Sequence, residues 1–497
     1  TVAGLLACLA SGCASGGSSV GKEAAADEIK KGGFTVAASC HDPQIIREGD
    51  TYYMFGSHMV GAKCQDLRKW NYFANGVDAA NTLFDNLLTE PYAAFDFVGK
   101  NTDNGYSVWA SNVIYNETMK KYVMYFCTTS SYVKSTLCFA TADNIEGPYT
   151  YVDTILYSGY GKSNISETNL YDVLGKNADI SRYLEYGGYN NKEWPNCIDP
   201  AIFTDADGRM WMNYGSWSGG IFLLEIDPTT GYPIYPVDDK DADPYYGYRL
   251  IGGGHHSAEG PYIQYDAENG YYYLFVSYGD LQSDGGYQIR QFRSEKPTGP
   301  YVDVAGNTLE DQDDHFNYGL KMMGNYTFPS LNYTYMAPGG QSTFQDDDGK
   351  YYITYHQRFD DGTEYHEPRV HQMYTNEDGW FVAAPFATMG ETLSEKGYKK
   401  SDVSGTFYVV NHGTDISSKI REAEAYTFAD GKVTGGEKSG TYEVKEGTDY
   451  ITITLDGVVY KGVLMEMTDE AENPVFCFLA AGDNEETLWG VQYIKKE

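Results

Sequence analysis

Short runs of apolar and aromatic residues alternate along the chain with turns rich in Gly, Asp and Asn. One unit recurs five times, and consists of a short apolar strand, an acidic or glycine-containing turn and an aromatic-rich strand. Its first strands begin at Asp42, Ala110, Asp199, Gly260 and Gly340, and its second strands at Thr51, Lys121, Arg209, Tyr271 and Lys350. The alternation of apolar and polar positions and the enrichment in aromatic or β-branched side chains predict strands in both segments, and Asp207-Gly208 and Asp348-Gly349 predict hairpin turns.

The length of the repeat selects the architecture. Units of roughly 60 to 90 residues, each long enough for about four strands, are typical of propeller blades rather than of solenoid repeats. We therefore predict an all-β protein with a five-bladed β-propeller over residues 34–395. Past Lys399 and Lys400 the rhythm changes to short strands such as Tyr450-Ile-Thr-Ile-Thr-Leu, so residues 400–497 are expected to form a small, separate β-barrel or sandwich domain.

The N-terminal segment has a different character. Residues 1–13 form an apolar run that is too short to span a bilayer but suits the hydrophobic region of a signal peptide. Its end, Ala10-Ser11-Gly12-Cys13, resembles a bacterial lipobox, with Cys8 as a weaker second candidate and an ordinary signal peptide as the alternative. We expect residues 1–33 to be a lipoprotein signal and a flexible tether, so that an exported, cell-surface or extracellular monomer meets the membrane only through Cys13.

Charge narrows the choice of partners. The 497 residues carry a formal net charge of -34, which repels phosphate backbones, so nucleic acid is excluded as a partner. The 47 tyrosines suit strands and also suit stacking on sugar rings. Beyond Cys13 there are six cysteines without a CxxC pair, which argues against a zinc ribbon and leaves room for one or two disulfides.

Three acidic residues stand at one place in the repeat. The first strand of each blade lines the central channel of a propeller, so the five strand starts converge there, and Asp42, Asp199 and Glu259 fall at or next to these positions. Hydrolysis of an acetal needs one group that protonates the leaving oxygen and a second that activates water. Acidic residues are also common in turns, and spacing alone leaves a catalytic cluster and a chance arrangement equally open.

The surrounding motifs resemble those of family 43 glycoside hydrolases. They are His41-Asp42-Pro43, Asn196-Cys197-Ile198-Asp199-Pro200 and Ala258-Glu259-Gly260-Pro261-Tyr262, in the family's order and on the expected blades. The resemblance implies that Asp42 is the general base, Glu259 the general acid, and Asp199 the residue that orients the acid and tunes its pKa. It also implies inversion at the anomeric carbon by single displacement.

A fourth motif, Tyr355-His356-Gln357-Arg358, resembles the fifth-blade histidine motif of the arabinanases in this family. The resemblance implies that His356 binds a metal, usually Ca²⁺, in the channel and largely through water. The alternative is a hydrogen-bonded core histidine. The C-terminal segment is similar to the β-barrel of two-domain endo-arabinanases.

Sugar contacts are expected from the same resemblance. The predicted positions are Trp109, Asn196, Cys197, Ile198, Ser216, Trp217 and Ser218. The chain departs from the family at Trp217-Ser218, where many members have Phe-Trp, and at Ser111, where many have Pro. These departures bear on linkage and chain-length preference and leave the carboxylates untouched.

The leading hypothesis is an endo-acting α-1,5-L-arabinanase acting on a neutral plant polysaccharide, arabinan. Alternatives are an exo-arabinanase, α-L-arabinofuranosidase or β-xylosidase of the same family, or a surface glycan-binding propeller without catalysis. Residues 157–196 form a long segment rich in Tyr, Asn and Gly between the second and third blades. It could wall the substrate cleft or be a passive insertion.

Overall fold

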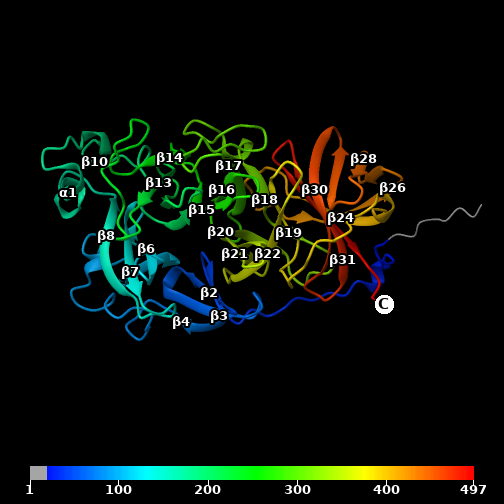
Figure 1. The fold of residues 1–497 in the computed structure, drawn as a ribbon, viewed down its shortest axis with the longest axis horizontal. Helices are drawn as coiled ribbons and strands as arrows, with labels where there is room; N and C mark the ends of the chain where they lie inside the picture. The colour runs from blue at the N-terminus through cyan, green and yellow to red at the C-terminus, as the bar shows by residue number, and fades with distance from the viewer. Residues whose placement is uncertain (1–18, 497) are drawn as a thin grey trace, which may run out of the picture.

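The computed structural model describes residues 19–496, so the predicted lipobox at Cys13 and Cys8 lies outside the described residues. The propeller consists of four antiparallel four-stranded sheets and one six-stranded sheet, and a closed eight-stranded barrel lies beside it along the longest axis (Figure 1). The all-β prediction of a five-bladed propeller followed by a barrel is confirmed.

Each blade is a meander whose strands follow one another in sequence. Blade one contains β1 (Gln44–Glu48), β2 (Thr51–Gly56), β3 (Val60–Cys64) and β4 (Asn71–Ala74), and blade two contains β5 (Ser107–Asn116), β6 (Lys121–Ser131), β7 (Lys134–Ala142) and β8 (Thr150–Ser158). Blade three contains β11 (Ala201–Thr204), β12 (Met210–Tyr214), β13 (Ile221–Ile226) and β14 (Tyr248–Ile251), and blade four contains β15 (Glu259–Asp266), β16 (Tyr271–Tyr278), β17 (Gln288–Ser294) and β18 (Leu320–Met323). Blade five contains β20 (Tyr335–Gln345), β21 (Tyr351–Phe359), β22 (Glu367–Thr375) and β23 (Phe381–Ala383).

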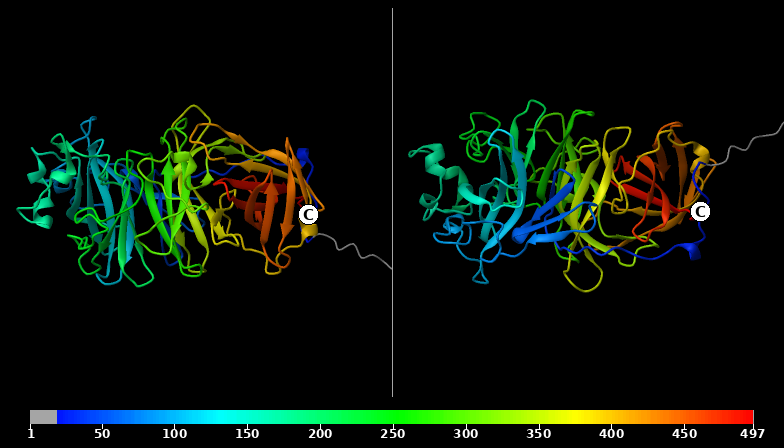
Figure 2. Two further views of the ribbon diagram at one scale, coloured as in Figure 1. Left: turned by 90° about the horizontal axis from the view of Figure 1, so that it is seen from above. Right: turned by 60° about the horizontal axis from the view of Figure 1, so that its bottom comes forward.

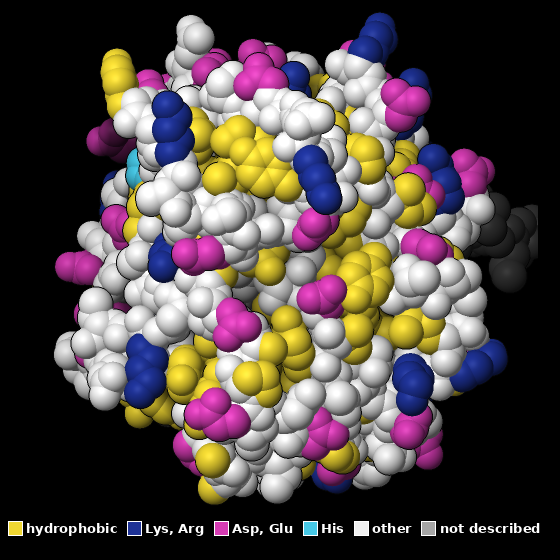
Figure 3. Space-filling model, turned by 90° about the vertical axis from the view of Figure 1, so that its left-hand side faces the viewer, with side chains coloured by type: hydrophobic (Ala, Val, Ile, Leu, Met, Phe, Trp, Pro, Cys, Tyr) yellow, Lys and Arg dark blue, Asp and Glu magenta, His cyan; other side chains and the backbone are white. Residues whose placement is uncertain are grey.

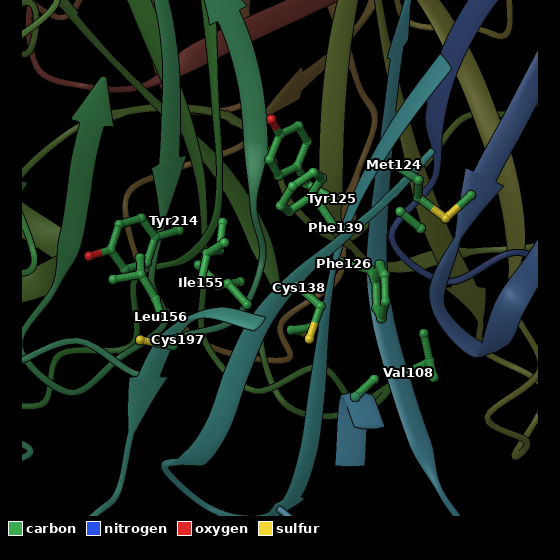
Figure 4. Packing of buried hydrophobic residues seen from close by; sticks show 14 of the residues in the cluster. Val108, Met124, Tyr125, Phe126, Cys138, Phe139, Ile155, Leu156, Cys197 and Tyr214 are labelled. Carbon is green, nitrogen blue, oxygen red and sulfur yellow. The ribbon is translucent and has the colours of Figure 1, made fainter. Parts of the chain in front are cut away.

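The middle strands of the blades are buried on both faces. In β6 the eight residues from Tyr122 to Thr129 are all buried, because the neighbouring blades cover both sides of the sheet. Aromatic and β-branched side chains fill such positions well, and Figure 4 shows Tyr125, Phe126 and Phe139 packed in this core. This burial explains why the second strand of each repeat reads as a continuous apolar run.

The barrel consists of β24 (Gly405–Asn411), β26 (Glu424–Ala429), β27 (Lys432–Gly435), β28 (Lys438–Val444), β29 (Tyr450–Leu455), β30 (Val458–Thr468), β31 (Pro474–Gly482) and β32 (Thr487–Tyr493). Its interior is filled by apolar side chains, Phe407, Phe428 and Phe478 among them. It packs closely against the propeller. Barrel residues such as Met465 and Trp489 share one apolar cluster with blades four and five, and β25 (Arg421–Glu422) pairs in parallel with β19 (Tyr326–Thr327) of the fifth sheet.

The described part of the predicted tether is also bound to the barrel. Val20 is buried in the barrel's core cluster, and the backbone N–H of Ala24 donates to the carbonyl of Tyr493 at 2.8 Å. From there the chain runs past the barrel to blade one (Figure 1). The expectation of a flexible tether is therefore wrong from residue 19 onward, because backbone pairing and apolar burial fix this segment.

Residues 157–196 carry the short helix α1 (Leu170–Leu174) and the hairpin of β9 (Leu184–Glu185) and β10 (Gly188–Tyr189) at the end of the propeller away from the barrel (Figure 2). Single 3-10 turns lie at Ala26–Glu28, Ser57–Met59, Ala93–Phe95, Ile165–Glu167, Ser181–Tyr183, His315–Asn317 and Lys400–Asp402. Within residues 19–496, no helix is long and apolar enough to cross a membrane.

The six cysteines of the described chain are all buried and free, so the one or two disulfides that we allowed for do not form among them. On the face turned away from the barrel, Lys and Arg side chains are scattered among acidic and apolar ones rather than gathered (Figure 3). A scattered distribution of this kind does not favour binding of a polyanion.

Candidate active site

The five aligned positions of the repeat, one in each blade, meet around the central channel. A cavity of about 40 Å³ is lined by one residue triplet from each blade, beginning at Asp42, Ala110, Asp199, Gly260 and Gly340. All five of these residues have a left-handed backbone, with φ between 49 and 59°. The shared conformation shows that these positions are structurally equivalent, as the sequence alignment of the repeats assumes.

The channel is held together by bonds that run from blade to blade. The backbone N–H of Asp42 donates to Nδ1 of His356 at 3.2 Å, and that of Ala110 to Oγ of Ser57 at 2.9 Å. The N–H of Gly260 donates to Oδ2 of Asp199 at 3.1 Å, and that of Gly340 to Oγ of Ser277 at 2.9 Å. In each case a side chain of one blade satisfies the first strand of the next, which fixes the carboxylates relative to one another.

Asp42 is set up to stay ionised. Its Oδ2 accepts hydrogen bonds from His41 Nδ1 at 2.7 Å and from Ser57 Oγ at 2.6 Å. Burial opposes ionisation, but the charge and hydrogen bond of His41 and the hydrogen bond of Ser57 outweigh it, so the pKa of Asp42 is lowered. An ionised carboxylate can accept a proton from water.

Glu259, at the start of β15, has the opposite tendency. Burial raises the pKa of its carboxyl group, and the negative charge of Asp42 adds to this. Hydrogen bonds from Tyr287 to Oε1 at 2.7 Å, and from Ser216 and Trp217 to Oε2 at 3.0 Å each, oppose the rise without cancelling it. A carboxyl group with a raised pKa can hold a proton and donate it.

The pKa of Asp199 depends on both of these groups. Burial and the charges of Asp42 and Glu259 raise its pKa well above the usual value, while the N–H of Gly260 opposes the rise. Three neighbouring carboxyl groups cannot all ionise cheaply, so the site divides into one charged acid and two that retain protons more readily.

A cleft of about 620 Å³ opens above the channel next to Glu259. Trp109, Asn196, Ile198, Ser216 and Trp217 line it, so five of the predicted sugar contacts face the same space. Its remaining walls come from residues 101–103, 107 and 129–132 at blade two, from His255 and from residues 279–282 of blade four.

Two predicted sugar contacts do not line this cleft. The side chain of Cys197 is fully buried and packs near Leu156 and Tyr214 in the core of the propeller (Figure 4). The side chain of Ser218 is also fully buried, and its Oγ is hydrogen bonded to the hydroxyl of Tyr132 at 2.7 Å. Neither side chain is exposed to the cleft, so a contact with substrate at these two positions stays a prediction.

The long segment between blades two and three supports the cleft from behind. Of residues 157–196, only Asn196 lines the cleft. The backbone of Glu193 and Trp194 lies directly on Gly219, where a Cβ atom would come within 2.4 Å of Glu193. The N–H of Gly219 donates to the carbonyl of Trp194 at 2.9 Å. The segment therefore braces the loop that carries Trp217.

Several site residues were not predicted from the sequence. Tyr287 and Ser57 hold the carboxyl groups of Glu259 and Asp42, and Tyr132 and His255 line the cleft and are hydrogen bonded to each other at 2.8 Å. Tyrosine is so frequent in this chain that no single one stands out. For Ser57 a signal exists, because Ser57 and Ser277 both stand near the end of the second strand of their repeats.

His356 is placed both as a core histidine and as a candidate metal ligand. Its side chain is fully buried, burial lowers its pKa well below the usual value, and Nδ1 accepts the N–H of Asp42. Its Nε2 is buried and has no hydrogen-bond partner among the described residues. His41, Asp42 and His356 each offer a ligand atom within 4.8 Å of the others. A neutral imidazole with an unused nitrogen beside a carboxylate fits a cation site.

Comparison with known families gives two matches. The model of glycosyl hydrolases family 43 matches residues 173–381, and that of a C-terminal lipocalin-like domain matches residues 385–490. The first match includes Asp199, Glu259 and His356, and the second covers most of the barrel.

Characterised relatives extend over nearly the whole chain. The extracellular endo-α-(1→5)-L-arabinanase 2 of Bacillus subtilis is 38% identical over 467 residues, which cover 91% of this chain and 92% of the relative. The extracellular endo-α-(1→5)-L-arabinanase of Thermotoga petrophila is 36% identical, with 92% and 94% covered. The crystal structure of endo-1,5-α-L-arabinanase from Thermotoga petrophila superimposes with a TM-score of 0.79 at 35% identity, covering 94% of this chain and all of that one.

Proposed function

The chain belongs to glycosyl hydrolases family 43, and we propose that it is an endo-acting arabinanase that hydrolyses internal α-1,5-L-arabinofuranosidic bonds of arabinan. The observation that carries the proposal is the divergence of two carboxyl groups at one site: the pKa of Asp42 is lowered and that of Glu259 is raised. A base and an acid coexist there at the same pH, as hydrolysis of an acetal requires.

Asp42 takes the role of general base. Its carboxylate is oriented by His41 and Ser57 through Oδ2, which leaves Oδ1 free of these two bonds to accept a proton from a water molecule. The water then attacks the anomeric carbon from the side opposite the leaving group, and the configuration inverts in a single displacement.

Glu259 takes the role of general acid. Its protonated carboxyl group donates to the glycosidic oxygen as the bond to the leaving sugar breaks. Trp217 and Ser216 hold Oε2, Tyr287 holds Oε1, and Trp217 also lines the cleft. We assign Asp199 to orienting the acid and tuning its pKa, because its Oδ2 accepts the N–H of Gly260, the residue that follows Glu259, and its own pKa responds to the charge of Glu259.

We further propose a calcium site at His356 in the channel. When bound, a cation would supply positive charge beneath the carboxyl groups. If the unpartnered Nε2 held the cation, the ring proton would have to lie on Nδ1, the atom that now accepts the N–H of Asp42. Binding of a cation and the hydrogen bond to Asp42 therefore compete, and binding should be detectable by its effect on this contact as well as by its effect on activity.

Export and anchoring remain part of the proposal. The relatives from Bacillus subtilis and Thermotoga petrophila are named as extracellular enzymes. We propose that this chain is likewise exported, and that Cys13 is acylated and retains it at the bacterial surface as a monomer. Mass spectrometry of the membrane-associated protein, compared with a Cys13→Ser variant, would detect the lipid and its loss.

The direct test is to incubate the purified protein with debranched arabinan, with and without a chelator, and to follow the size of the products. Long oligosaccharides early in the reaction are expected from internal cleavage. Arabinose or a short product from the start would instead indicate exo action, and release from aryl xylosides but not from arabinan would indicate a β-xylosidase. Arabinan binding without any hydrolysis would support the glycan-binding alternative.

A further inference from the structure

The loop between barrel strands β24 and β26, residues 413–421, leaves the barrel and reaches the propeller next to the active site. We call this segment the barrel loop. We propose that the barrel loop is a positioning element of the active site, because it holds Tyr287, one of three residues that donate to the carboxyl group of Glu259. The inference rests on the proposed function, since it assigns a role to the barrel in the same reaction.

Tyr287 and the barrel loop meet at one apolar cluster. Tyr287 is buried in a small apolar cluster with Met336 and Ala337, and the partly buried Ile420 of the barrel loop packs against this cluster. On another side the Tyr287 ring lies on Gly339, where a Cβ atom would come within 2.2 Å of the ring. The apolar cluster that contains Tyr287 is therefore covered in part by the barrel loop, and the Tyr287 hydroxyl donates to Glu259 Oε1.

The backbone just before Tyr287 also contacts the barrel loop. Gly286 has a φ of 73°, and a Cβ atom there would lie 2.8 Å from the backbone nitrogen of Ser417 in the barrel loop. Gly286 also closes the short loop whose residues 279–282 line the substrate cleft, through a bridge to Asp280. The barrel loop thus supports both Tyr287 and one wall of the cleft.

Hydrogen bonds from blade four hold the barrel loop in place. Buried polar side chains of blade four bind its carbonyl groups: Gln288 and Lys321 both donate to the carbonyl of Asp415, at 2.9 and 2.8 Å, and Arg290 donates to that of Thr414. These three side chains are at most 4% exposed. Buried donors without these acceptors would be costly, so the loop and the propeller fold as one unit.

Asn325 links the far end of the barrel loop to blade five. Asn325 donates to the carbonyl of Ser418 at 3.1 Å and accepts the N–H of Ala337 at 2.7 Å. Ala337 is a member of the apolar cluster around Tyr287. A displacement of the barrel loop would therefore be transmitted to Tyr287 by apolar contact and by hydrogen bonding.

The consequence for catalysis has a defined sign. Donation from Tyr287 stabilises the ionised form of Glu259 and lowers its pKa. The titratable groups that face Glu259 are Asp42, Asp199 and Tyr287. Removing the donor should raise the pKa of Glu259 and move the basic limb of the kcat/KM profile to higher pH. Misplacement of the carboxyl group should at the same time lower kcat more than it changes KM.

The test compares matched pairs of variants by their pH profiles, with Tyr287→Phe as the reference for a lost donor. Ile420→Ala should shift the basic limb in the same direction as Tyr287→Phe and lower kcat, whereas Ile420→Val should restore most of the wild-type profile. The control is Ile451→Ala in the buried core of the barrel, which should lower Tm without moving the limb. An unmoved limb in Ile420→Ala, or an equal shift in Ile451→Ala, would overturn the proposal.

A second pair guards against loss of folding in the first. Gly286→Ala drives a methyl group into the backbone of Ser417, whereas Gly270→Ala has nearly the same φ, 72°, and nothing within 4 Å of its Cβ position. Only Gly286→Ala should shift the basic limb. Product formation from arabinan by the wild type tests the proposed function separately, because all variants are scored relative to the wild type on a substrate that it cleaves.

Discussion

At the scale of single residues, the environments of the carboxyl groups decide their roles. Glu259 is kept protonated by burial and by Asp42, while three donors hold it in one orientation. Glu259→Gln keeps the shape and loses the proton, so we expect the rate of arabinan hydrolysis to fall about 10²–10⁴-fold. Steady-state kinetics measure this. Glu268→Gln, exposed in the turn after the same strand, should retain wild-type activity, and a similar loss there would contradict the assignment.

A second residue-scale prediction concerns Tyr132, whose hydroxyl joins Ser218 and His255 across the cleft rim at 2.7 and 2.8 Å. Tyr132→Phe removes both bonds and should loosen the rim. We expect KM for arabinan to rise about 2–10-fold with a smaller effect on kcat, in line with one or two lost hydrogen bonds. Tyr115→Phe, which alters an exposed ring on β5, is the control. Equal KM values for both variants would rule out a role for the bridge.

The sequence identified some of these residues and not others for a physical reason. Asp42, Asp199 and Glu259 are separated by more than a hundred positions overall, yet the repeat places them at one level of the channel, so alignment of the blades predicts that they lie close together. Their separate roles were expected only from the resemblance to a known family. Tyr287 and Tyr132 act through the direction of their hydroxyl groups, which no local pattern encodes. The same limit applies to Cys197 and Ser218, whose side chains are buried away from the cleft, because a motif gives proximity to the site but not the side of the backbone on which a side chain lies.

At the scale of elements, the backbone conformation at the position of each blade that lines the channel is as important as its residue type. Gly340 has a φ of 59°, and a Cβ atom there would lie 2.4 Å from Asp42 Oδ1 and 2.7 Å from the ring of His356. Gly340→Ala should therefore displace the base and abolish most activity while the protein still folds. Gly349→Ala, in the hairpin that follows the same strand, shares the positive φ but has nothing within 4 Å, and should lower Tm slightly with activity intact.

Circular dichroism and kinetics on the two alanine variants check this prediction together. The positive φ alone costs roughly 1–2 kcal/mol for a residue with a Cβ, so both variants should lose some stability. A loss of activity shared equally by both would mean that backbone strain, rather than contact with Asp42, is responsible.

Strands were predictable from the sequence to within a residue or so in several cases. β2, β6 and β16 begin at Thr51, Lys121 and Tyr271, where the repeat placed them. Residues 157–196 resisted prediction because they carry little periodic burial. Their Tyr160, Tyr183 and Trp194 pack against the outer part of blade three, and this tertiary contact rather than local propensity fixes the segment.

At the scale of the whole molecule, the sequence did not predict that the barrel packs closely against the propeller. The change of rhythm near Lys399 marks a real boundary between sheets, but the apolar faces on either side of it are buried against each other. Amphipathic strands predict that a face is covered and not which partner covers it. The same reasoning applies to the residues after Gly21, which looked like a linker and instead pair with the end of β32.

The interface between the two parts also contains an acid that should make stability depend on pH. Glu485, in the hairpin between β31 and β32, is 5% exposed, and burial followed by the charge of Asp303 raises its pKa from 4.5 to about 9. Its Oε2 has no hydrogen-bond partner among the described residues. The folded protein thus binds one more proton than the unfolded chain between these two pH values, so stability should fall as the pH rises through this window.

Glu485→Gln removes that dependence, because an amide keeps the shape of the protonated acid and cannot ionise. We expect the variant to gain Tm relative to the wild type at pH 8 and to gain less at pH 4, where the wild-type carboxyl group is protonated in both states. Glu472→Gln, at an exposed barrel position with a similar left-handed backbone, should show no such difference between the two pH values. Thermal unfolding at both pH values decides the matter, and an equal shift of Tm at pH 4 and pH 8 would mean that Glu485 does not carry a proton in the folded protein.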